Sequence, residues 1–314
     1  MIAPSAAAER AAQQSARLVL VTGAEGQVGW EARRTFAPLG RVVAVDRADV
    51  DFADVESVRA LVREHRPAVI VNAAAYTAVD RAESERELAF AINATAPRAL
   101  AEEAARLGAV IVHFSTDYVF DGTKNAPYAE DDEPSPLNVY GETKLAGDRA
   151  VMSSGAAHLV FRTSWVYAAR GHNFLRTMLA LAHERDTLRV VADQIGAPTP
   201  ARLLAEIGAQ LVSRHLGDGA PALPESQWGI YNAVTRGATS WHGFAQRILE
   251  LDPRRSAQRC REVVPIPTGD YSTPARRPAR SLLDVRKLER TFQLRMPAWD
   301  DQLELVMAEL SAQP

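Results

Sequence analysis

The feature that most constrains the fold is a glycine pattern between a short apolar strand and a helix. Residues 17–22 are typical of a buried strand, and Gly23, Gly26 and Gly29 follow directly. The first glycine suits a tight turn, the second lets a pyrophosphate approach the backbone, and the third allows close packing of helix on strand. The N-terminus of the following helix also favours negative charge. This spacing predicts the first unit of a dinucleotide-binding sheet, although glycines occur at many strand-to-helix turns.

Strands and helices alternate along the first half of the chain. Runs rich in valine, isoleucine and leucine predict strands over residues 17–22, 41–46, 68–72, 109–115 and 158–162. Helices are expected over residues 30–39, 55–65, 88–107 and 140–151. Strands that are apolar throughout and are joined by helices of about ten or more residues indicate a parallel sheet covered on both faces. The pattern therefore predicts an α/β fold with a Rossmann-type doubly wound sheet.

The second half is less regular and predicts a smaller, mostly helical C-terminal lobe that binds substrate. Helices are expected over residues 174–184, 202–216, 241–251 and 299–310, and short strands over residues 188–191 and 229–234. We expect a disordered tail over residues 1–16 and a dinucleotide-binding domain over residues 17–168, with returning segments near 188–199 and 228–236. The substrate-binding lobe then comprises residues 169–187, 200–227 and 237–314.

Charge balance and the single cysteine limit the kinds of partner. The 314 residues carry 36 lysines and arginines against 39 aspartates and glutamates, a net charge of −3, so no overall charge draws the chain to nucleic acid or to an anionic membrane. No stretch reaches the roughly 18 consecutive apolar residues of a membrane helix. Cys260 is alone and cannot form an internal disulfide, which predicts a reducing compartment and a cytoplasmic location.

Acidic residues follow the second predicted strand, where a dinucleotide-binding sheet holds the adenosine half of its cofactor. Asp46 is placed to bind ribose hydroxyls, which favours NAD, whereas Arg47 is able to hold a 2′-phosphate, which favours NADP. The residues leave this choice open, and both also fit a solvated strand end. Asp51 and Phe52 come where the chain passes the adenine, and Asp54 is expected to cap the next helix.

Tyr140 and Lys144 form a Tyr-x-x-x-Lys pair on a predicted helix, so the phenol and the ammonium project from one face. A phenol titrates near about pH 10 in water, and a nearby ammonium stabilises its phenolate, which makes a usable acid and base. Such pairs also occur by chance on surface helices. Ser115 and Thr116 end the fourth predicted strand, where open α/β sheets bind ligands. The three groups are therefore expected to converge on a nicotinamide.

Further blocks of sequence resemble the extended short-chain dehydrogenase/reductases, and more narrowly the dTDP-4-dehydrorhamnose reductase family. They run in family order from about residue 17 to the C-terminus, at residues 26–30, 71–83, 115–122, 135–141, 162–167, 193–199, 239–242 and 273–278. The resemblance implies reduction of the C4 ketone of dTDP-4-dehydro-6-deoxy-L-mannose in the last step of dTDP-rhamnose biosynthesis. We expect both NADPH and NADH to be accepted as cofactor, with NADPH favoured through Arg47.

The resemblance also implies roles for individual residues. Tyr140 is the implied proton donor, Lys144 binds the nicotinamide ribose and lowers the pKa of Tyr140, and Thr116 hydrogen-bonds the substrate oxygen. Asp117 and Trp165 are the implied sugar contacts, although Trp165 also fits core packing. The implied cofactor contacts beyond the three glycines, Asp46 and Arg47 are Gln27 and Val28 at the pyrophosphate, Asp51 and Phe52 at the adenine, and Ala75, Tyr76 and Thr77 after the third strand. Tyr76 stands where other members often carry histidine.

One departure from the family concerns a divalent metal, which some members are described as holding between subunits with two glutamates. Glu31 matches the first position, but Arg202 stands at the second. A guanidinium offers no metal ligand, so we expect no metal site and no Mg²⁺ bridge in this protein. A homodimer without such a bridge remains open.

Several alternatives share this fold. Nucleotide-sugar 4,6-dehydratases carry Thr-Asp-Glu at the end of the fourth strand, whereas this chain has Tyr118 after Thr116 and Asp117, which disfavours elimination. A nucleotide-sugar epimerase or another nucleotide-sugar reductase is harder to exclude. The regulatory β subunit of methionine adenosyltransferase, an NADP-binding protein without this catalysis, also resembles these reductases. The complete set of Thr116, Tyr140 and Lys144 favours an enzyme.

A basic run near the C-terminus has two interpretations. Arg276, Arg277 and Arg280 either reach nucleotide phosphates from the smaller lobe or lie in a solvated loop, and the sequence leaves both open.

Overall fold

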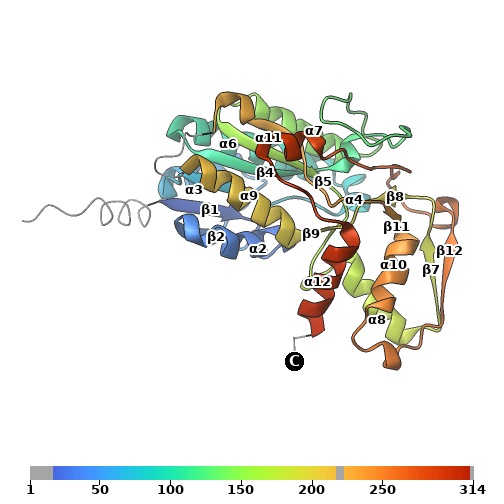
Figure 1. The fold of residues 1–314 in the computed structure, drawn as a ribbon. Coiled ribbons are helices and arrows are strands. Elements are labelled where there is room, and N and C mark those ends of the chain that lie inside the picture. The colour runs from blue at the N-terminus through green and yellow to red at the C-terminus, as the bar shows by residue number, and fades with distance from the viewer. Residues whose placement is uncertain (1–16, 217–222, 312–314) are drawn as a thin grey trace, which may run out of the picture.

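The computed structural model describes residues 17–216 and 223–311, so the predicted tail over residues 1–16 lies outside the described residues. Its central sheet has six parallel strands in the order β10-β5-β4-β3-β1-β2. Figure 1 labels β1, β2, β4 and β5 of this sheet. These strands are β1 (Leu18–Thr22), β2 (Arg41–Val45), β3 (Val69–Asn72), β4 (Val110–Thr116), β5 (Ala157–Thr163) and β10 (Gly229–Asn232). The predicted α/β fold with a Rossmann-type doubly wound sheet is confirmed.

Both faces of the sheet are buried because alternate residues of each strand pack under helices on opposite sides. One set of β1 side chains lies in a core with helices α2 (Gln27–Thr35) and α9 (Ala201–Leu216). The other set lies in a second core with helices α3 (Val55–His65) and α6 (Ala96–Leu107). This burial on both sides explains why the strands are apolar at nearly every position.

The carboxyl ends of the central strands meet along one edge of the sheet. Thr22 at the end of β1 pairs in register with Asn72 of β3, and Thr116 of β4 pairs with Thr163 of β5. Helix α7 (Val139–Met152) follows β4 after a long connection and packs against β4. The glycine turn, Thr116 and helix α7 are therefore brought to the same edge.

The single helix predicted over residues 88–107 is wrong in one respect, because the structure interrupts it. Helix α5 (Arg86–Phe90) continues into a π-helical turn over Ala91–Thr95 before α6 begins. The side chain of Asn93 in this turn is fully buried, where it accepts from the Tyr76 backbone N–H (2.8 Å) and donates to the Tyr76 carbonyl (3.0 Å). The wider turn thus aims an amide inward to hold the loop after β3.

The smaller lobe lies beside the sheet domain at lower right in Figure 1. Its main elements are helices α8 (Phe174–Glu184), α10 (Trp241–Glu250) and α12 (Trp299–Ser311), and the parallel pair β7 (Thr187–Val191) and β12 (Glu262–Ile266). Two short helices belong to the sheet domain, where α4 (Val79–Ala82) packs against α7 and α11 (Arg286–Phe292) packs against β10. The two-residue strands pair as β6 (Val166–Tyr167) with β9 (Thr199–Pro200) and β8 (Ile195–Gly196) with β11 (Thr239–Ser240). None of the helices in the described parts of the chain is long and apolar enough to cross a membrane.

The packing divides the chain differently from the division expected over residues 200–227 and 188–199. Helix α9 packs on α2 and contributes Leu204 and Leu211 to the sheet core, so it belongs to the larger domain. Strand β10 joins the central sheet beside β5. Strand β7 instead pairs with β12 in the smaller lobe. Strand β12 was not predicted from the sequence, so this pair was not predicted either.

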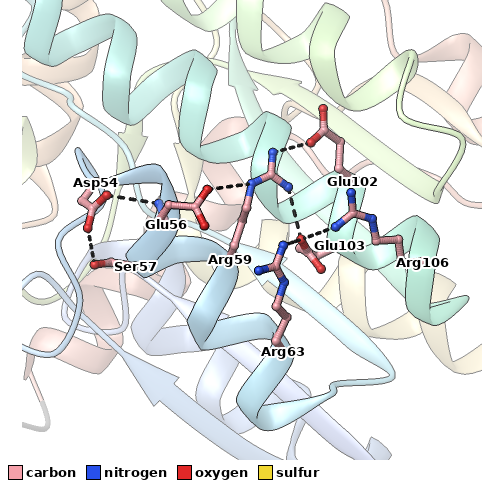
Figure 2. Close-up of polar contacts among 8 residues, drawn as sticks. All are labelled: Asp54, Glu56, Ser57, Arg59, Arg63, Glu102, Glu103 and Arg106. Atoms are coloured by element: carbon pink, nitrogen blue, oxygen red, sulfur yellow. Dashed lines mark hydrogen bonds and ion pairs between the residues drawn. The ribbon is translucent and has the colours of Figure 1, made fainter.

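Helices α3 and α6 are joined across their outer faces by a network of charges, shown in Figure 2. The carboxylate of Glu103, only 4% exposed, receives Arg59 (3.2 Å), Arg63 (2.7 Å) and Arg106 (2.8 Å). Arg59 also binds Glu102 at 2.5 Å. At the start of α3, Asp54 caps the helix by accepting from the Glu56 N–H, as predicted.

Candidate active site

The glycine turn has the geometry that close approach of a phosphate requires. Gly23 has φ +67°, and a Cβ there would lie 2.7 Å from the carbonyl carbon of Ala73. A Cβ on Gly29 would lie 2.0 Å from the Gly23 carbonyl oxygen, so only glycine allows α2 to pack so closely. Gly26 caps α2 with no side chain over the helix N-terminus. These positions fit a dinucleotide pyrophosphate, because backbone N–H groups and the helix dipole face the turn.

The residues after the turn are tied to the loop that follows β6. Gln27 accepts from Asn173 Nδ2 (3.0 Å) and donates to the Val166 carbonyl (3.3 Å). The guanidinium of Arg170 lies 3.2 Å from the ring centre of Trp30, and that of Arg33 lies 4.7 Å from the same ring. Val28 packs against the sheet core. Sequence reasoning did not include Trp30, Arg170 or Asn173, since their contacts join distant parts of the chain.

Asp46 and Arg47, which follow β2, differ in their surroundings: Asp46 is hydrogen-bonded to the glycine turn, and Arg47 is exposed. The Asp46 carboxylate accepts from the backbone N–H groups of Glu25 (2.7 Å) and Arg47 (2.6 Å), so it closes against the glycine turn. The Arg47 side chain is exposed and makes no ion pair within the described residues. Asp51 is exposed and accepts from the Ala53 N–H, while Phe52, 7% exposed, packs in the sheet core.

The loop after β3 holds Tyr76 between Ala75, which is half-buried, and Thr77, which is exposed. Tyr76 is 7% exposed, and its hydroxyl donates to Glu85 at 2.5 Å. Burial raises the pKa of Tyr76, and the nearby Glu85 carboxylate raises it further. The phenol is thus hydrogen-bonded to Glu85 at the start of helix α5. Its ring packs in a small apolar cluster, and Tyr140 packs against that cluster.

Tyr140 and Thr116 meet at the edge of the sheet. Burial raises the pKa of the half-buried Tyr140, and a hydrogen bond with the Thr116 hydroxyl opposes that rise. The Thr116 hydroxyl also accepts from the Tyr118 N–H (3.2 Å) and lies 3.1 Å from Asp117 Oδ1. The ring of Tyr118 stands edge-on to that of Tyr140, with centroids 5.8 Å apart.

Lys144 lies one turn below Tyr140 and is 2% exposed. Its Nζ donates to the Phe114 carbonyl at 2.6 Å. Burial lowers the pKa of Lys144 to about 8, and the Asp148 carboxylate opposes that fall. Burial sets the direction of the Tyr140 pKa shift, and the Lys144 ammonium is directed at the Phe114 carbonyl, so the lowering of the Tyr140 pKa by Lys144 stays a prediction.

Asp117 is a buried carboxyl beside these groups. It is 2% exposed, and its Oδ2 has no hydrogen-bond partner. Burial raises the pKa of Asp117 to about 7, against hydrogen bonds from Ser281 and Thr116 that favour the carboxylate. A carboxyl group of this kind can accept or donate a hydrogen bond near neutral pH.

Trp165 leaves the end of β5 in a strained backbone conformation, with φ +49°. Its ring stacks on Trp241 of α10 with centroids 3.6 Å apart, and it covers Gly196, where a Cβ would lie 2.5 Å from the indole. Trp241 donates to Gln194 at 3.2 Å. Trp165 is half-buried, so it joins the two lobes and still presents part of its ring.

The basic run near the C-terminus divides into two kinds of residue. Arg277 makes a double ion pair with Asp80 (3.1 and 2.8 Å) and donates to Thr273 (2.5 Å), so it anchors its own loop. Arg276 and Arg280 are exposed. The structure thus removes Arg277 from the candidate phosphate contacts and leaves the other two.

Glu31 and Arg202 lie together on α2 and α9. Glu31, 5% exposed, accepts from Arg202 Nε (3.1 Å) and Arg34 (2.7 Å), and Arg202 also binds Glu309 at 2.9 Å. No group of three or more histidine, cysteine, aspartate or glutamate side chains in the described ranges is arranged to hold a metal ion.

The chain is similar to known proteins along nearly its whole length. The RmlD substrate binding domain family matches residues 17–312. A dTDP-4-dehydrorhamnose reductase of Burkholderia thailandensis is 46% identical over 298 residues, covering 94% of this chain and 99% of that protein. The dTDP-4-dehydrorhamnose reductase of Escherichia coli K12 is 45% identical, covering 93% and 97%.

The chain is also similar to solved structures along nearly its whole length. The dTDP-4-dehydrorhamnose reductase of Bacillus anthracis, in complex with NADP, superposes with a TM-score of 0.84 at 34% identity, covering 93% of this chain and 99% of that one. A UDP-glucose 4-epimerase of Thermus thermophilus shares the fold alone, at 20% identity and a TM-score of 0.76. The extent and degree of these matches show that the chain belongs to the dTDP-4-dehydrorhamnose reductase family.

Proposed function

We propose that this protein is an NAD(P)H-dependent oxidoreductase that reduces the C4 ketone of dTDP-4-dehydro-6-deoxy-L-mannose to give dTDP-L-rhamnose. This is the final step of dTDP-L-rhamnose biosynthesis. The observation that carries the proposal is that Thr116, Tyr140 and Lys144 lie at the same edge of the sheet as the glycine turn. It is supported by 46% identity to a reductase of this activity.

The glycine turn is the proposed cradle of the cofactor pyrophosphate, with Gln27 and Val28 at the start of α2. The NADP held by the Bacillus anthracis relative supports this choice of cofactor. Asp46, already bound to the turn, is the proposed neighbour of the adenosine ribose, and the exposed Arg47 is the proposed partner of a 2′-phosphate. Asp51 and Phe52 are the proposed neighbours of the adenine. Ala75, Tyr76 and Thr77 are the proposed neighbours of the nicotinamide half of the cofactor. We expect NADPH to be preferred and NADH to be accepted.

Side chains of the protein itself supply the proton and stabilise the charge that develops on the C4 oxygen. When bound, NADPH supplies the hydride that adds to the ketone carbon. Tyr140 keeps its proton at neutral pH because burial raises its pKa, and it donates that proton to the C4 oxygen. Thr116 donates a second hydrogen bond to the same oxygen as negative charge develops there. Lys144, buried one turn below, binds the nicotinamide ribose and stabilises the phenolate left on Tyr140.

The proposed sugar contacts are Asp117 and Trp165. Asp117 offers a buried carboxyl with an unpartnered oxygen, which suits a sugar hydroxyl. The half-exposed indole of Trp165 suits the apolar face of the ring, and Trp241 behind it holds the indole in place. Since the single cysteine fits a reducing compartment, we propose a cytoplasmic location.

The test is NADPH oxidation, followed by the loss of the absorbance of the reduced nicotinamide, on addition of dTDP-4-dehydro-6-deoxy-L-mannose. We expect steady turnover and a product identical with dTDP-L-rhamnose by mass and NMR. The matched control is the same sugar carried on UDP. NADPH binding without any turnover would contradict the proposal and would indicate a non-catalytic binding protein.

A further inference from the structure

A group of buried polar side chains lies beneath the active-site edge and is used by none of the steps above. Asp148 is fully buried on helix α7, one turn after Lys144, and Arg162 of β5 is 3% exposed. Arg162 Nε lies 3.3 Å from Asp148 Oδ2. Asp148 Oδ1 has no hydrogen-bond partner. The free oxygen of this fully buried carboxylate still lacks a donor, so the carboxylate can stabilise a second cation nearby.

The other neighbours of Asp148 do not provide that charge. His113 of β4 is fully buried, and its Nε2 lies 4.0 Å from Asp148 Oδ1. Thr22 donates to Asn72 Oδ1 (2.8 Å), so Asn72 Nδ2 donates to His113 Nδ1 (3.0 Å) and the imidazole proton sits on Nε2. Burial and Lys144 hold the pKa of His113 well below its usual range, so the ring is neutral. Ser115 of β4 adds only a hydroxyl.

Lys144 is therefore the second cation that interacts with the Asp148 carboxylate, after Arg162. Residues four apart on a helix have Cβ atoms about 5–6 Å apart, which places Lys144 and Asp148 on the same buried face. Gly147 makes this packing possible, because a Cβ there would lie 2.2 Å from the Asn93 carbonyl oxygen of the π turn. The buried set holds two cations, Lys144 and Arg162, and one anion, Asp148, so one positive charge remains in excess.

We propose that Asp148 is a positioning residue for Lys144: its buried carboxylate, shared with Arg162, keeps the Lys144 ammonium charged beneath Tyr140. This inference rests on the proposed function, in which that charge holds the nicotinamide ribose and stabilises the Tyr140 phenolate. The Tyr-x-x-x-Lys pair thus extends one turn further along α7, to the acid at position 148. Arg162 keeps the acid itself ionised, since a lone buried carboxylate would take up a proton.

The test compares Asp148→Asn with the wild-type protein and with Asp148→Glu over pH 6 to 9.5. Loss of the carboxylate removes a stabilising neighbour of the ammonium, so Lys144 loses its proton at lower pH. We expect the alkaline fall in kcat/KM to move down by about one pH unit in Asp148→Asn. The defect should be under about twofold at pH 6 and about tenfold near pH 8.5. Asp148→Glu should restore the wild-type profile.

A second readout does not need turnover. We expect the Kd of NADPH, measured by fluorescence titration, to rise with pH about one unit earlier in Asp148→Asn than in wild type. If the wild-type protein binds NADPH but reduces no sugar nucleotide, the proposed function fails while this titration still tests Asp148. Glu103→Gln is the matched control, since it removes an equally buried, arginine-bound carboxylate far from the site. It should lower Tm and leave both pH profiles unchanged.

A purely structural role for Asp148 would lower Tm without moving either profile, and that result would overturn the proposal. If Asp148→Asn does not fold, Asp148→Ser is measured instead, because its smaller side chain removes the charge and keeps a hydroxyl that can accept from Arg162. The same shift of both profiles to lower pH is expected in Asp148→Ser, and profiles that coincide with wild type would also overturn the proposal.

Discussion

Single side chains set the chemistry of this site through their burial. Burial raises the pKa of Tyr140, lowers that of Lys144 to about 8 and raises that of Asp117 to about 7. All three shifts favour the neutral form of the group, because a charge loses its solvation inside the protein. Only Lys144 has a buried counter-ion on its own helix, so it keeps its charge at neutral pH while Tyr140 keeps its proton. This is the arrangement that a proton-donating reductase needs.

The first prediction removes the proposed proton donor. Tyr140→Phe deletes the hydroxyl and keeps the ring, so we expect an unchanged Kd for NADPH and a kcat lower by about 10²–10⁴-fold. Tyr118→Phe is the matched control, because its ring packs edge-on against Tyr140 and no proton transfer is assigned to it. A loss of less than about tenfold in Tyr140→Phe would show that another group donates the proton.

The second prediction concerns cofactor choice. Arg47→Ala should weaken NADPH binding by about tenfold and leave NADH binding unchanged, because only NADPH carries the 2′-phosphate. Isothermal titration with each cofactor measures both constants. Arg41→Ala, at the opposite end of β2, should affect neither cofactor. Equal weakening of both cofactors would remove the 2′-phosphate role from Arg47.

The third prediction concerns Asp117 and pH. Its folded-state pKa of about 7 lies above the ordinary value of 3.8, so the folded protein holds a proton that the unfolded chain has released. The stability tied to this group is fully present below about pH 4 and is lost as pH rises through about 7. Asp117→Asn should therefore raise Tm at pH 8 and change it little at pH 4. Thermal melts at the two pH values measure this, and an equal effect at both would contradict it.

The sequence was sufficient to predict candidate site residues that are close to one another in the chain or that lie at strand ends. Tyr140 and Lys144 were recognisable because four residues bring side chains together on a helix, and Thr116 because strand ends meet at one edge. The partners of these groups were not recognisable. Arg162 and His113 approach Asp148 only through the pairing of β4 with β5, and Trp241 reaches Trp165 across the two lobes.

Elements with a complete apolar pattern were predicted closely, and elements without one were not. The central strands and helices α3 and α8 lie within a residue or two of their predicted bounds. The π turn at Ala91–Thr95 was missed because its apolar residues continue the helical pattern. The two-residue strands β6, β8, β9 and β11 were missed because pairs this short depend on long-range contacts.

The fourth prediction concerns the joint between α3 and α6. Glu103→Gln leaves three arginines around an amide in place of a buried carboxylate (Figure 2). We expect a loss of about 1–3 kcal/mol in the free energy of unfolding, measured by urea denaturation. Glu102→Gln, at a side chain that is 37% exposed and binds only Arg59, should cost less than about 1 kcal/mol. Similar losses in the two variants would show that burial of Glu103 does not matter.

At the scale of the whole molecule, the two lobes are joined by several contacts, of which two bear on the site and on the metal question. Trp165 at the end of β5 stacks on Trp241 of α10, beside the proposed sugar site. Arg202 of α9 binds Glu31 of α2 and Glu309 of α12, which joins the sheet domain to the smaller lobe within one chain. In the second contact, the carboxylate of Glu31 is paired with the guanidinium of Arg202 from the same chain.

The last prediction follows from that internal ion pair. Mg²⁺ requires an octahedral set of oxygen ligands and keeps most of its waters, whereas Arg202 brings a guanidinium that offers none. EDTA should therefore change neither the steady-state rate nor the mass measured by light scattering. Arg202→Glu is the informative variant, because it places a second carboxylate beside Glu31 and near Glu206, and its stability should then rise with added Mg²⁺. A fall in the mass of the wild-type protein with EDTA, reversed by Mg²⁺, would show that a neighbouring acid such as Glu206 binds metal despite the ion pair.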